Sequence, residues 1–316
     1  MKSIQQPPAR VHIGIDVAKA TLQADLQGTS CRFANTEAGH GALLAALPAG
    51  AFAVLEATGS YHLEVTARLQ AALIPVAVAN PARVRQFARA RGTLAKTDPV
   101  DAALLSAFGV AFDPPPVPPR DPERELLGEL VNLRDQLVAE ITRWGNLGEH
   151  QQAAAARKIA ATQAAGACKA LAAVEKEIAR LVAGSAALAP AFAVLRGCQG
   201  VGPVTGAVLL AAMPELGRIG RRQAASLAGL APCANDSGKH HGKRMTRGGR
   251  PRVKRALYLA ALSALRHHPA LKAAYRALRE KGKPAKAAIV AIARKLLVML
   301  NAKLKEHYAV VAAATA

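Results

Sequence analysis

The sequence predicts two kinds of structure in one chain, a mixed α/β sheet followed by a mainly helical part. Up to residue 112, short apolar strands alternate with helical segments, which is typical of a sheet covered by helices. After residue 120, apolar residues recur every three or four positions, which is the period of helices. Between these parts, residues 113–120 contain five prolines and predict a stiff extended linker.

The first predicted strand, residues 11–17, delivers one carboxylate. Val11, Ile13 and Ile15 alternate with smaller or polar residues, and Asp16 stands where that apolar run ends. A carboxylate at the edge of a core is costly unless a cation balances it, and a hard divalent cation is a usual partner. For a lone aspartate, a turn or a cap is the simpler interpretation.

The next elements predict a three-stranded meander and then alternating helices and strands. Strands over 21–26 and 31–35 are joined to the first by turns, and the apolar run 51–55 predicts a strand buried on both faces that ends at Glu56. The other elements expected here are helices over 37–47, 61–73 and 81–90 and a strand over 75–79.

A second pair of acids opens the last helix of this part. Pro99 suits the first helical position, which makes Asp98 the expected N-cap and Asp101 its N3 partner. Capping explains each acid separately, but residues three apart share a helix face, where two carboxylates repel unless a proton or a cation lies between them. The ordered set Asp16, Glu56, Asp98 and Asp101 therefore predicts a site for Mg²⁺ (or Mn²⁺), with room for two ions about 4 Å apart, as in phosphoryl transfer.

The helical part begins with a predicted hairpin over 121–185, and residues 186–316 are expected to form a further helical domain. Two apolar stripes suit either the core of an antiparallel hairpin or a coiled coil between subunits. The stripes are Leu126, Leu130, Leu133, Leu137, Ile141 and Trp144 on one helix, and Leu171, Val174, Ile178 and Leu181 on the other. Amphipathic helices are also predicted over 258–265 and 287–300, with a basic turn at 281–286 between them.

Gly200 and Gly202 lie in a turn between two predicted helices, which is typical of a helix-hairpin-helix element. Such a turn brings backbone N–H groups against a phosphate without reading sequence. Close packing of two helices would need the same glycines. The turn does not fit a dinucleotide-binding fingerprint, which wants a preceding strand and a third glycine at a fixed offset.

A strongly basic stretch follows, with no acid among its cations. These cations are Lys239, Lys243, Arg244, Arg247, Arg250, Arg252, Lys254 and Arg255. If all eight met phosphates, affinity would fall by roughly 10³ to 10⁵ between 50 and 200 mM salt. Its glycines predict a mobile loop that lets backbone approach a ligand closely. A solvated loop that binds nucleic acid without taking part in chemistry is the simpler interpretation, and Ser237 within it is by itself an ordinary turn residue.

Several of these motifs together resemble one known family. Gly14-Ile15-Asp16-Val17-Ala18-Lys19, Glu56-Ala57-Thr58-Gly59 and Lys96-Thr97-Asp98-Pro99-Val100-Asp101-Ala102 resemble the four-acid pattern of RuvC-like transposases of bacterial insertion-sequence family one-hundred-ten. Asp236-Ser237-Gly238-Lys239 and Gly242-Lys243-Arg244 resemble that family's C-terminal motif. The resemblance covers the whole chain.

The resemblance implies an RNase H-like (RuvC-like) nuclease domain over 1–112 and a serine transposase domain over 186–316. It makes Ser237 the nucleophile that attacks the scissile phosphate, with Ser226 as a runner-up that we expect to serve helix packing instead. It also implies a structured bridge RNA that pairs with donor and target double-stranded DNA. Members of the family work as multimers through the coiled-coil region, so a homo-oligomer, dimer to tetramer, is expected.

The composition agrees with a nucleic-acid partner. Lys plus Arg is 42 against 21 Asp plus Glu, a formal net charge of +21, which favours a polyanion through release of its condensed counterions. No apolar run reaches spanning length, and residues 1–10 lack the apolar core of a signal peptide, so we expect a cytoplasmic, nucleoid-associated protein without a membrane partner. The four scattered cysteines indicate neither a disulfide framework nor a zinc site.

Two other classes of function stay open at this point. A RuvC-like junction endonuclease would use the same four acids with water as the nucleophile, and would tolerate loss of Ser237. A non-catalytic nucleic-acid chaperone would explain the charge alone, and predicts no effect of replacing Asp16 or Glu56 beyond stability.

Overall fold

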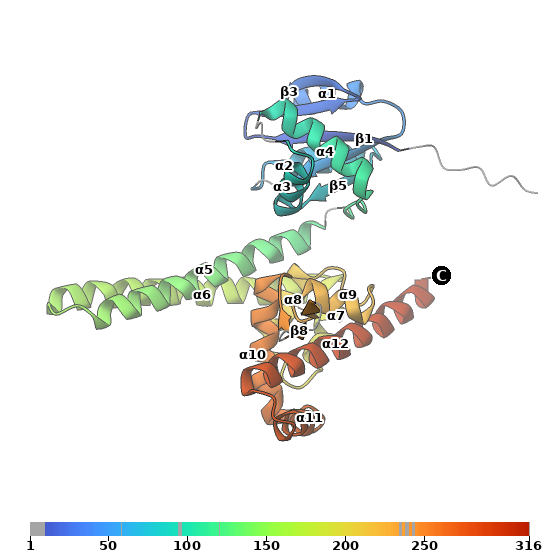
Figure 1. Cartoon of the computed structure of the whole chain (residues 1–316). Helices are drawn as coiled ribbons and strands as arrows, with labels where there is room; N and C mark the ends of the chain where they lie inside the picture. The colour runs from blue at the N-terminus through green and yellow to red at the C-terminus, as the bar shows by residue number, and fades with distance from the viewer. Residues whose placement is uncertain are drawn as a thin grey trace, which may run out of the picture. The chain divides into compact units, whose positions relative to one another are not determined.

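The computed structural model describes residues 10–57, 59–93, 97–119, 121–233, 236–237, 240–241 and 244–315, with backbone alone at 236–237, 240–241 and 315. The chain forms two compact units, Met1–Arg120 and Asp121–Ala316. The first contains a mixed sheet and the second is mainly helical, which confirms the prediction of a mixed α/β part followed by a mainly helical part (Figure 1).

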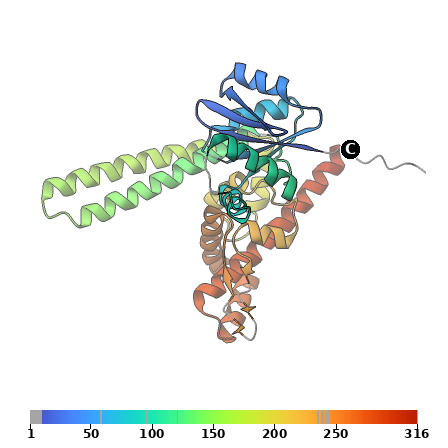
Figure 2. The same ribbon diagram turned by 45° about the horizontal axis from the view of Figure 1, so that its top comes forward.

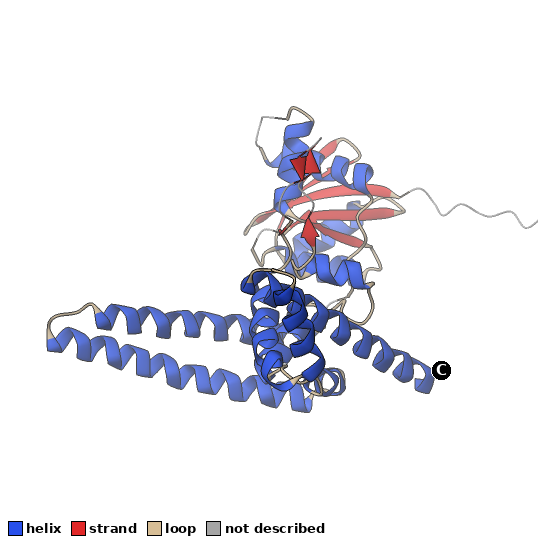
Figure 3. Ribbon diagram, turned by 60° about the horizontal axis from the view of Figure 1, so that its bottom comes forward, coloured by secondary structure: helices blue, strands red, loops and turns tan. Residues whose placement is uncertain are grey.

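The first unit is built on a five-stranded sheet with the order β3-β2-β1-β4-β5 (Figure 3). Strands β1 (Val11–Val17), β2 (Thr21–Leu26) and β3 (Thr29–Ala34) form the predicted antiparallel meander. Strands β4 (Ala51–Glu56) and β5 (Val76–Ala79) continue the sheet in parallel with β1. Because β1 and β4 are parallel neighbours, their carboxyl ends meet at one edge of the sheet.

Helices cover both faces of this sheet. On one face, Ile15 and Leu55 pack with Leu43 of α1 (Glu37–Ala46) and Leu69 of α2 (His62–Ala71). On the other face, Val54 packs with residues of α3 (Pro81–Ala90) and α4 (Asp98–Phe112). Alternation along each strand therefore decides which of its residues face α4.

Gly14 lets α4 lie directly on β1. A Cβ atom at Gly14 would stand 2.0 Å from the carbonyl oxygen of Ala102 and 2.4 Å from the amide nitrogen of Ser106. The close approach also lets the Gly14 amide donate a hydrogen bond to Ser106 Oγ at 2.7 Å. Any side chain at Gly14 would force the helix away from the strand, so this glycine sets the depth at which α4 packs.

The Pro-rich segment is held against the first unit. The Val117 amide donates to the Val76 carbonyl on β5 at 2.7 Å, and Gln70 Nε2 donates to the carbonyls of Val117 and Pro118 at 3.0 and 3.1 Å. Val117 also packs against the core shared with α1 and α2. The segment is extended, as its prolines predict, but part of it lies along the sheet edge.

The second unit begins with a long antiparallel hairpin, α5 (Pro122–Glu149) and α6 (Ala154–Gly184), whose helices run side by side (Figure 2). Val174 and Ile178 of the predicted α6 stripe are buried. On α5, Leu130 and Leu137 of the predicted stripe pack against the core beside the buried Leu127 and Val131, whereas Leu126 and Leu133 of the stripe are 42% and 44% exposed. Both 126 and 127 are leucine, so periodicity alone does not choose between the two faces.

Among the described residues, six further helices complete this unit around one core. They are α7 (Leu188–Arg196), α8 (Pro203–Ala212), α9 (Arg221–Leu227), α10 (Pro251–His267), α11 (Pro269–Glu280) and α12 (Ala285–Thr315). The predicted helices 258–265 and 287–300 lie inside α10 and α12. Among the described helices, none is long and apolar enough by itself to span a bilayer, and one adjoining pair, α6 with α7, meets that length and composition only when taken together across a bend of 111°.

Candidate functional site

Asp16 and Glu56 lie side by side at one edge of the sheet. Ile15 pairs with Leu55 across the parallel strands β1 and β4, so the residues that follow them are neighbours at the carboxyl ends. Ile15 and Leu55 both point into the core on the α1 and α2 face. Because side chains alternate along a strand, Asp16 and Glu56 both belong to the face covered by α4.

The two helical acids lie in the first turn of α4, on the same face of the sheet. Helix α4 begins at Asp98 with Thr97 as its N-cap, which makes the predicted N-cap at Asp98 wrong by one residue, and Thr97 makes no side-chain capping bond. Asp101 directly precedes Ala102, whose carbonyl oxygen faces Gly14 on β1. The first turn of α4 therefore lies beside the strand end that carries Asp16.

Arg32 belongs to the same site and was missed from the sequence. The register pairs Asp16 with Gln23 and Gln23 with Arg32, so the three residues form a row across β1, β2 and β3. Arg32 Nε donates to Gln23 Oε1 at 3.2 Å, and its Nη2 lies 3.5 Å from Asp98 Oδ2. Strand alternation was the signal that could have placed Arg32 on the acidic face.

The donor chemistry of this edge fits a hard divalent cation, whereas the side-chain positions do not yet form a metal cage. Carboxylate oxygens are the ligands that Mg²⁺ and Mn²⁺ prefer. Within the described residues, no group of three or more Asp, Glu, His or Cys side chains is close enough to hold a metal ion. The backbone thus brings all four predicted acids to one edge and one face of the sheet.

Ser237 lies in an antiparallel ribbon, where the sequence predicted a mobile loop. Strand β6 (Pro232–Cys233) pairs with β9 (Met245–Thr246), and β7 (Asp236–Ser237) pairs with β8 (His240–His241). We call the described residues of this region, 232–233, 236–237, 240–241 and 244–246, the Ser237 ribbon. Gly238, Lys239, Gly242 and Lys243 lie outside the described residues. Ser226, the runner-up, is exposed on α9 and is not the packing residue that we expected.

The base of the Ser237 ribbon is fixed by a bidentate ion pair. Arg250 donates to both carboxylate oxygens of Glu215, at 2.8 and 2.6 Å, and to the Ala212 carbonyl at 2.8 Å. Burial is the largest single effect and raises the pKa of the Glu215 carboxyl, but the hydrogen bonds from Arg250 and from the backbone, together with the positive charges of Arg250 and Arg124, leave that pKa below its ordinary value. Beside this pair, a Cβ at Gly249 would stand 2.0 Å from the Gly229 amide nitrogen. The ribbon therefore rests on a rigid base.

Other cations of the basic stretch also have partners within the chain. Arg252 Nε and Arg255 Nη2 lie 2.8 and 3.0 Å from Asp135 Oδ2 on α5, and Lys254 Nζ donates to Thr246 Oγ1 at 2.9 Å. The stretch itself contains no acid, but Glu215 and Asp135 reach it from elsewhere in the chain. Counting charges along the sequence therefore overstates how many of the eight cations are unpaired.

The glycine turn between α7 and α8 has a packing role. Gly200 has a φ of +98°, and a Cβ there would stand 2.6 Å from Ala264 Cβ on α10. Gly200 is therefore required for helix packing, which is the simpler of the two interpretations of this turn. Gly202 is the N-cap of α8 and has open space where a Cβ would point.

Comparison with known proteins matches both units. Residues 13–149 match the DEDD transposase family of IS110 elements, and residues 193–276 match the transposase family IS116/IS110/IS902. The pilin gene-inverting proteins of Moraxella bovis and Moraxella lacunata are each 26% identical to this chain over 317 aligned positions, which cover 95% of it and 97% of them. An uncharacterized 43.6 kDa protein of insertion element IS110 from Streptomyces coelicolor is 35% identical over 124 residues, 37% of this chain and 29% of that protein.

These matches define an enzyme of the transposase and recombinase class that acts on DNA. Within that class, the chain belongs to the IS110 family of transposases.

Proposed function

We propose that this transposase exchanges DNA strands through a covalent link between Ser237 and a DNA phosphate, at an RNase H-like metal site formed by Asp16, Glu56, Asp98 and Asp101. The observation that carries the proposal is the register of β1 and β4 beneath α4, which brings four acids from three elements to one edge and one face. Capping or turn formation explains each acid alone, but does not explain why all four gather there.

The proposed step conserves the number of phosphoester bonds. A bond forms between Ser237 Oγ and phosphorus while the bond from phosphorus to the 3′ oxygen breaks. The serine proton passes to a base or water, and the 3′ oxygen leaves as a hydroxyl. Strand exchange reverses the step with a different 3′ hydroxyl, so no ATP is needed. Magnesium, when bound, would stabilise charge on the phosphate and on the leaving oxygen.

The chain's own residues prepare this site. Gly14 lets α4 approach β1 closely enough for its first turn to reach the strand end. Arg32, beside Asp98, offsets part of the repulsion among the acids when no cation is present. The ion pair of Arg250 with Glu215 holds the base of the Ser237 ribbon, which restricts the positions that a nucleophile on the ribbon can reach.

The proposed partners are donor and target double-stranded DNA, a structured guide RNA, and further copies of the chain. The net charge of +21 suits both nucleic acids. Leu126, Leu133 and Leu147 recur at multiples of seven residues and are 41–44% exposed on α5, which supports a coiled-coil contact between subunits. The name of the Moraxella relatives supports DNA inversion as one outcome of such an exchange.

The proposal is tested by looking for a protein–DNA adduct on a denaturing gel. Purified protein is incubated with Mg²⁺ and DNA that carries the element's ends, with the flanking RNA supplied or omitted. The expected result is an RNA-dependent adduct that Ser237→Ala and Asp16→Asn abolish and that the matched control Ser226→Ala retains. An adduct that survives Ser237→Ala would refute the assigned nucleophile.

The second candidate is a RuvC-like junction endonuclease that uses water. The observation in its favour is that the four acids gather within the first unit alone, without any residue of the Ser237 ribbon. It predicts cleaved DNA without an adduct, and full cleavage by Ser237→Ala. The same gel therefore separates the two candidates.

A further inference from the structure

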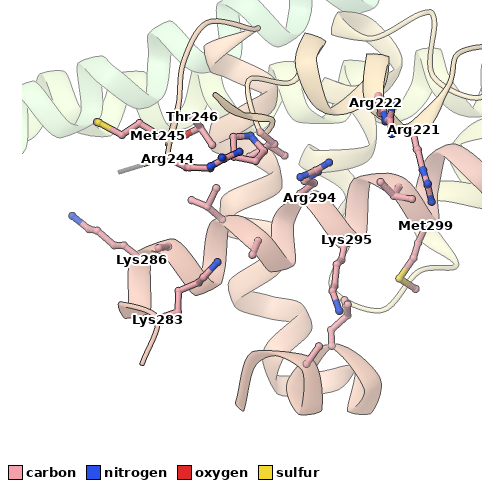
Figure 4. A pocket seen from close by; sticks show the side chains of 18 of the residues that line it. Arg221, Arg222, Arg244, Met245, Thr246, Lys283, Lys286, Arg294, Lys295 and Met299 are labelled. Atoms are coloured by element: carbon pink, nitrogen blue, oxygen red, sulfur yellow. The ribbon is translucent and has the colours of Figure 1, made fainter. Parts of the chain in front are cut away.

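A groove of about 1470 Å³ in the second unit carries a strong excess of positive charge (Figure 4). Its lining comes from α9, α11, α12 and the base of the Ser237 ribbon. Six of its cations, on α9 and around α12, are Arg221, Arg222, Lys283, Lys286, Arg294 and Lys295. We call this the basic groove. No Asp or Glu is among the described residues that line it.

These six cations differ from the arginines at the base of the ribbon. Arg250, Arg252 and Arg255 each have an acidic partner within 3.0 Å. In the part of the chain that the structure describes, the six side chains of the groove make no ion pair. Like charges gathered without counter-charges repel one another, and such a cluster is favourable once a polyanion binds across it.

Apolar side chains line the groove together with the cations. Leu271, Val290 and Met299 are among them, and we call these apolar lining residues the apolar floor. Along α12, Lys286, Val290 and Arg294 are spaced by four residues, so charge and apolar surface share one helix face. Figure 4 shows the labelled cations spread along the groove, from Lys286 at one end to Arg221 at the other. The lining positions 286–299 of α12 span about 20 Å at the helical rise.

We propose that the basic groove binds a single strand of nucleic acid, with phosphates on its cations and sugars or bases on its apolar floor. Charge complementarity selects a polyanion, and the floor selects one whose apolar surfaces are accessible. A duplex buries its base faces by stacking, so it would leave the floor uncovered. A length of about 20 Å suits roughly four nucleotides, the lower end of single-strand sites.

The groove continues into the base of the Ser237 ribbon. Met245 and Thr246 line it and form β9, which pairs with β6 in the same ribbon that carries Ser237. A strand lying in the groove therefore passes the foot of the ribbon. The inference deepens the proposed function by assigning a binding surface to the strand, but binding itself does not require Ser237 to be the nucleophile.

Binding is measured by fluorescence anisotropy on the full chain carrying Ser237→Ala, so that chemistry cannot interfere. The probes are a 15-nucleotide DNA strand, the same sequence as RNA, and the DNA duplex. The groove variant combines Arg222→Gln, Lys286→Gln and Arg294→Gln. The matched control combines Arg276→Gln, Lys303→Gln and Lys305→Gln, exposed residues of α11 and α12 that do not line the groove. Urea unfolding checks that both variants fold.

Loss of three phosphate contacts should reduce the salt slope, the steepness with which log affinity falls against log salt concentration, by about 2. Single-strand binding at 0.15 M salt should weaken about 50-fold, whereas the control should bind as the parent does. The DNA and RNA strands together report which sugar the groove prefers, and strong binding of either supports the inference. Equal losses in the two variants, or a loss of duplex binding in the groove variant as large as its loss of single-strand binding, would overturn it.

Methionines supply a second readout that does not depend on charge removal. Met245 and Met299 line the groove, and Met213 is buried in the core, 1% exposed. A bound strand should slow peroxide oxidation of Met245 and Met299 while Met213 stays unreactive in both states. If a saturating concentration of the strand left the oxidation rates of Met245 and Met299 unchanged, the groove would not be the binding site. This readout stands even if the adduct experiment rejects Ser237.

Discussion

Arg250 and Arg247 lie three residues apart in the basic stretch, and the structure predicts opposite effects when each is replaced by glutamine. Arg250 makes three hydrogen bonds, two to Glu215 and one to Ala212. Arg247 is exposed. The Arg250→Gln protein should lose stability with its nucleic-acid binding otherwise intact, whereas Arg247→Gln should weaken binding and leave stability unchanged.

The magnitude follows from the contacts of Arg250. Hydrogen bonds to charged groups contribute about 1.5–3 kcal/mol each. The Arg250 and Glu215 side chains are 36% and 35% exposed, so solvent screens their pair and the sum is discounted. We expect a loss of about 2–3 kcal/mol for Arg250→Gln, which is a shift of about 1 M in the urea midpoint. Arg247→Gln should stay within about 0.5 kcal/mol of the parent.

The pH dependence provides an independent check. The pKa of Glu215 is lowered in the folded protein, so its pairing stabilises the fold above the unfolded pKa and is lost as the pH falls through the folded value. The gap in urea midpoint between the parent and Arg250→Gln should therefore be full at pH 7 and should narrow below about pH 4.5. Equal midpoints for the two single variants at pH 7, or a gap that does not change with pH, would refute this reasoning.

Three further predictions concern single residues. Gly14→Ala should destabilise the first unit by about 3 kcal/mol, because the new Cβ would clash with the Ala102 carbonyl. Gly41→Ala on α1, where a Cβ would point into open space, should be neutral or slightly stabilising. Equal thermal unfolding temperatures for the two variants would contradict this packing. Asp135→Asn should release Arg252 and Arg255 and steepen the salt slope of DNA binding by about 1–2, and an unchanged slope would mean that neither arginine reaches phosphate. Arg32→Gln should lower the Mg²⁺ concentration for half-maximal cleavage up to about 5-fold, and a raised requirement would instead make Arg32 a contact to DNA.

Local patterns in the sequence were sufficient to predict most elements of the first unit. Alternation in 11–17 and the continuous apolar run in 51–55 gave β1 and β4, and the position of Asp16 and Glu56 at their ends followed directly. The start of α4 was misplaced by one residue because Thr97 and Asp98 are both good capping residues. The role of Gly14 depends on contact with a helix 88 residues later, at Ala102, which no local pattern contains.

Long-range contacts explain what was missed in the second unit. Leu126 and Leu127 have the same side chain, so only the packed hairpin shows that Leu127 is the buried one. Arg250 and Arg255 find acids that lie 35 and 120 positions earlier in the chain, at Glu215 and Asp135. The basic groove is likewise assembled from α9, α11, α12 and the ribbon, and its parts look in sequence like separate solvated charges.

The attachment site of a trapped protein–DNA adduct is the most direct test of the proposed chemistry. The adduct is digested with nuclease and trypsin, and the modified peptide is sequenced by mass spectrometry. Cleavage after Arg222 and Lys239 gives one peptide, 223–239, that contains both Ser226 and Ser237, so fragmentation within it decides between them. We predict a nucleotide phosphate on Ser237, together with a free 3′ hydroxyl on the other DNA end. A phosphate on any other residue, or cleaved DNA with unmodified peptide, would contradict serine attack by the ribbon.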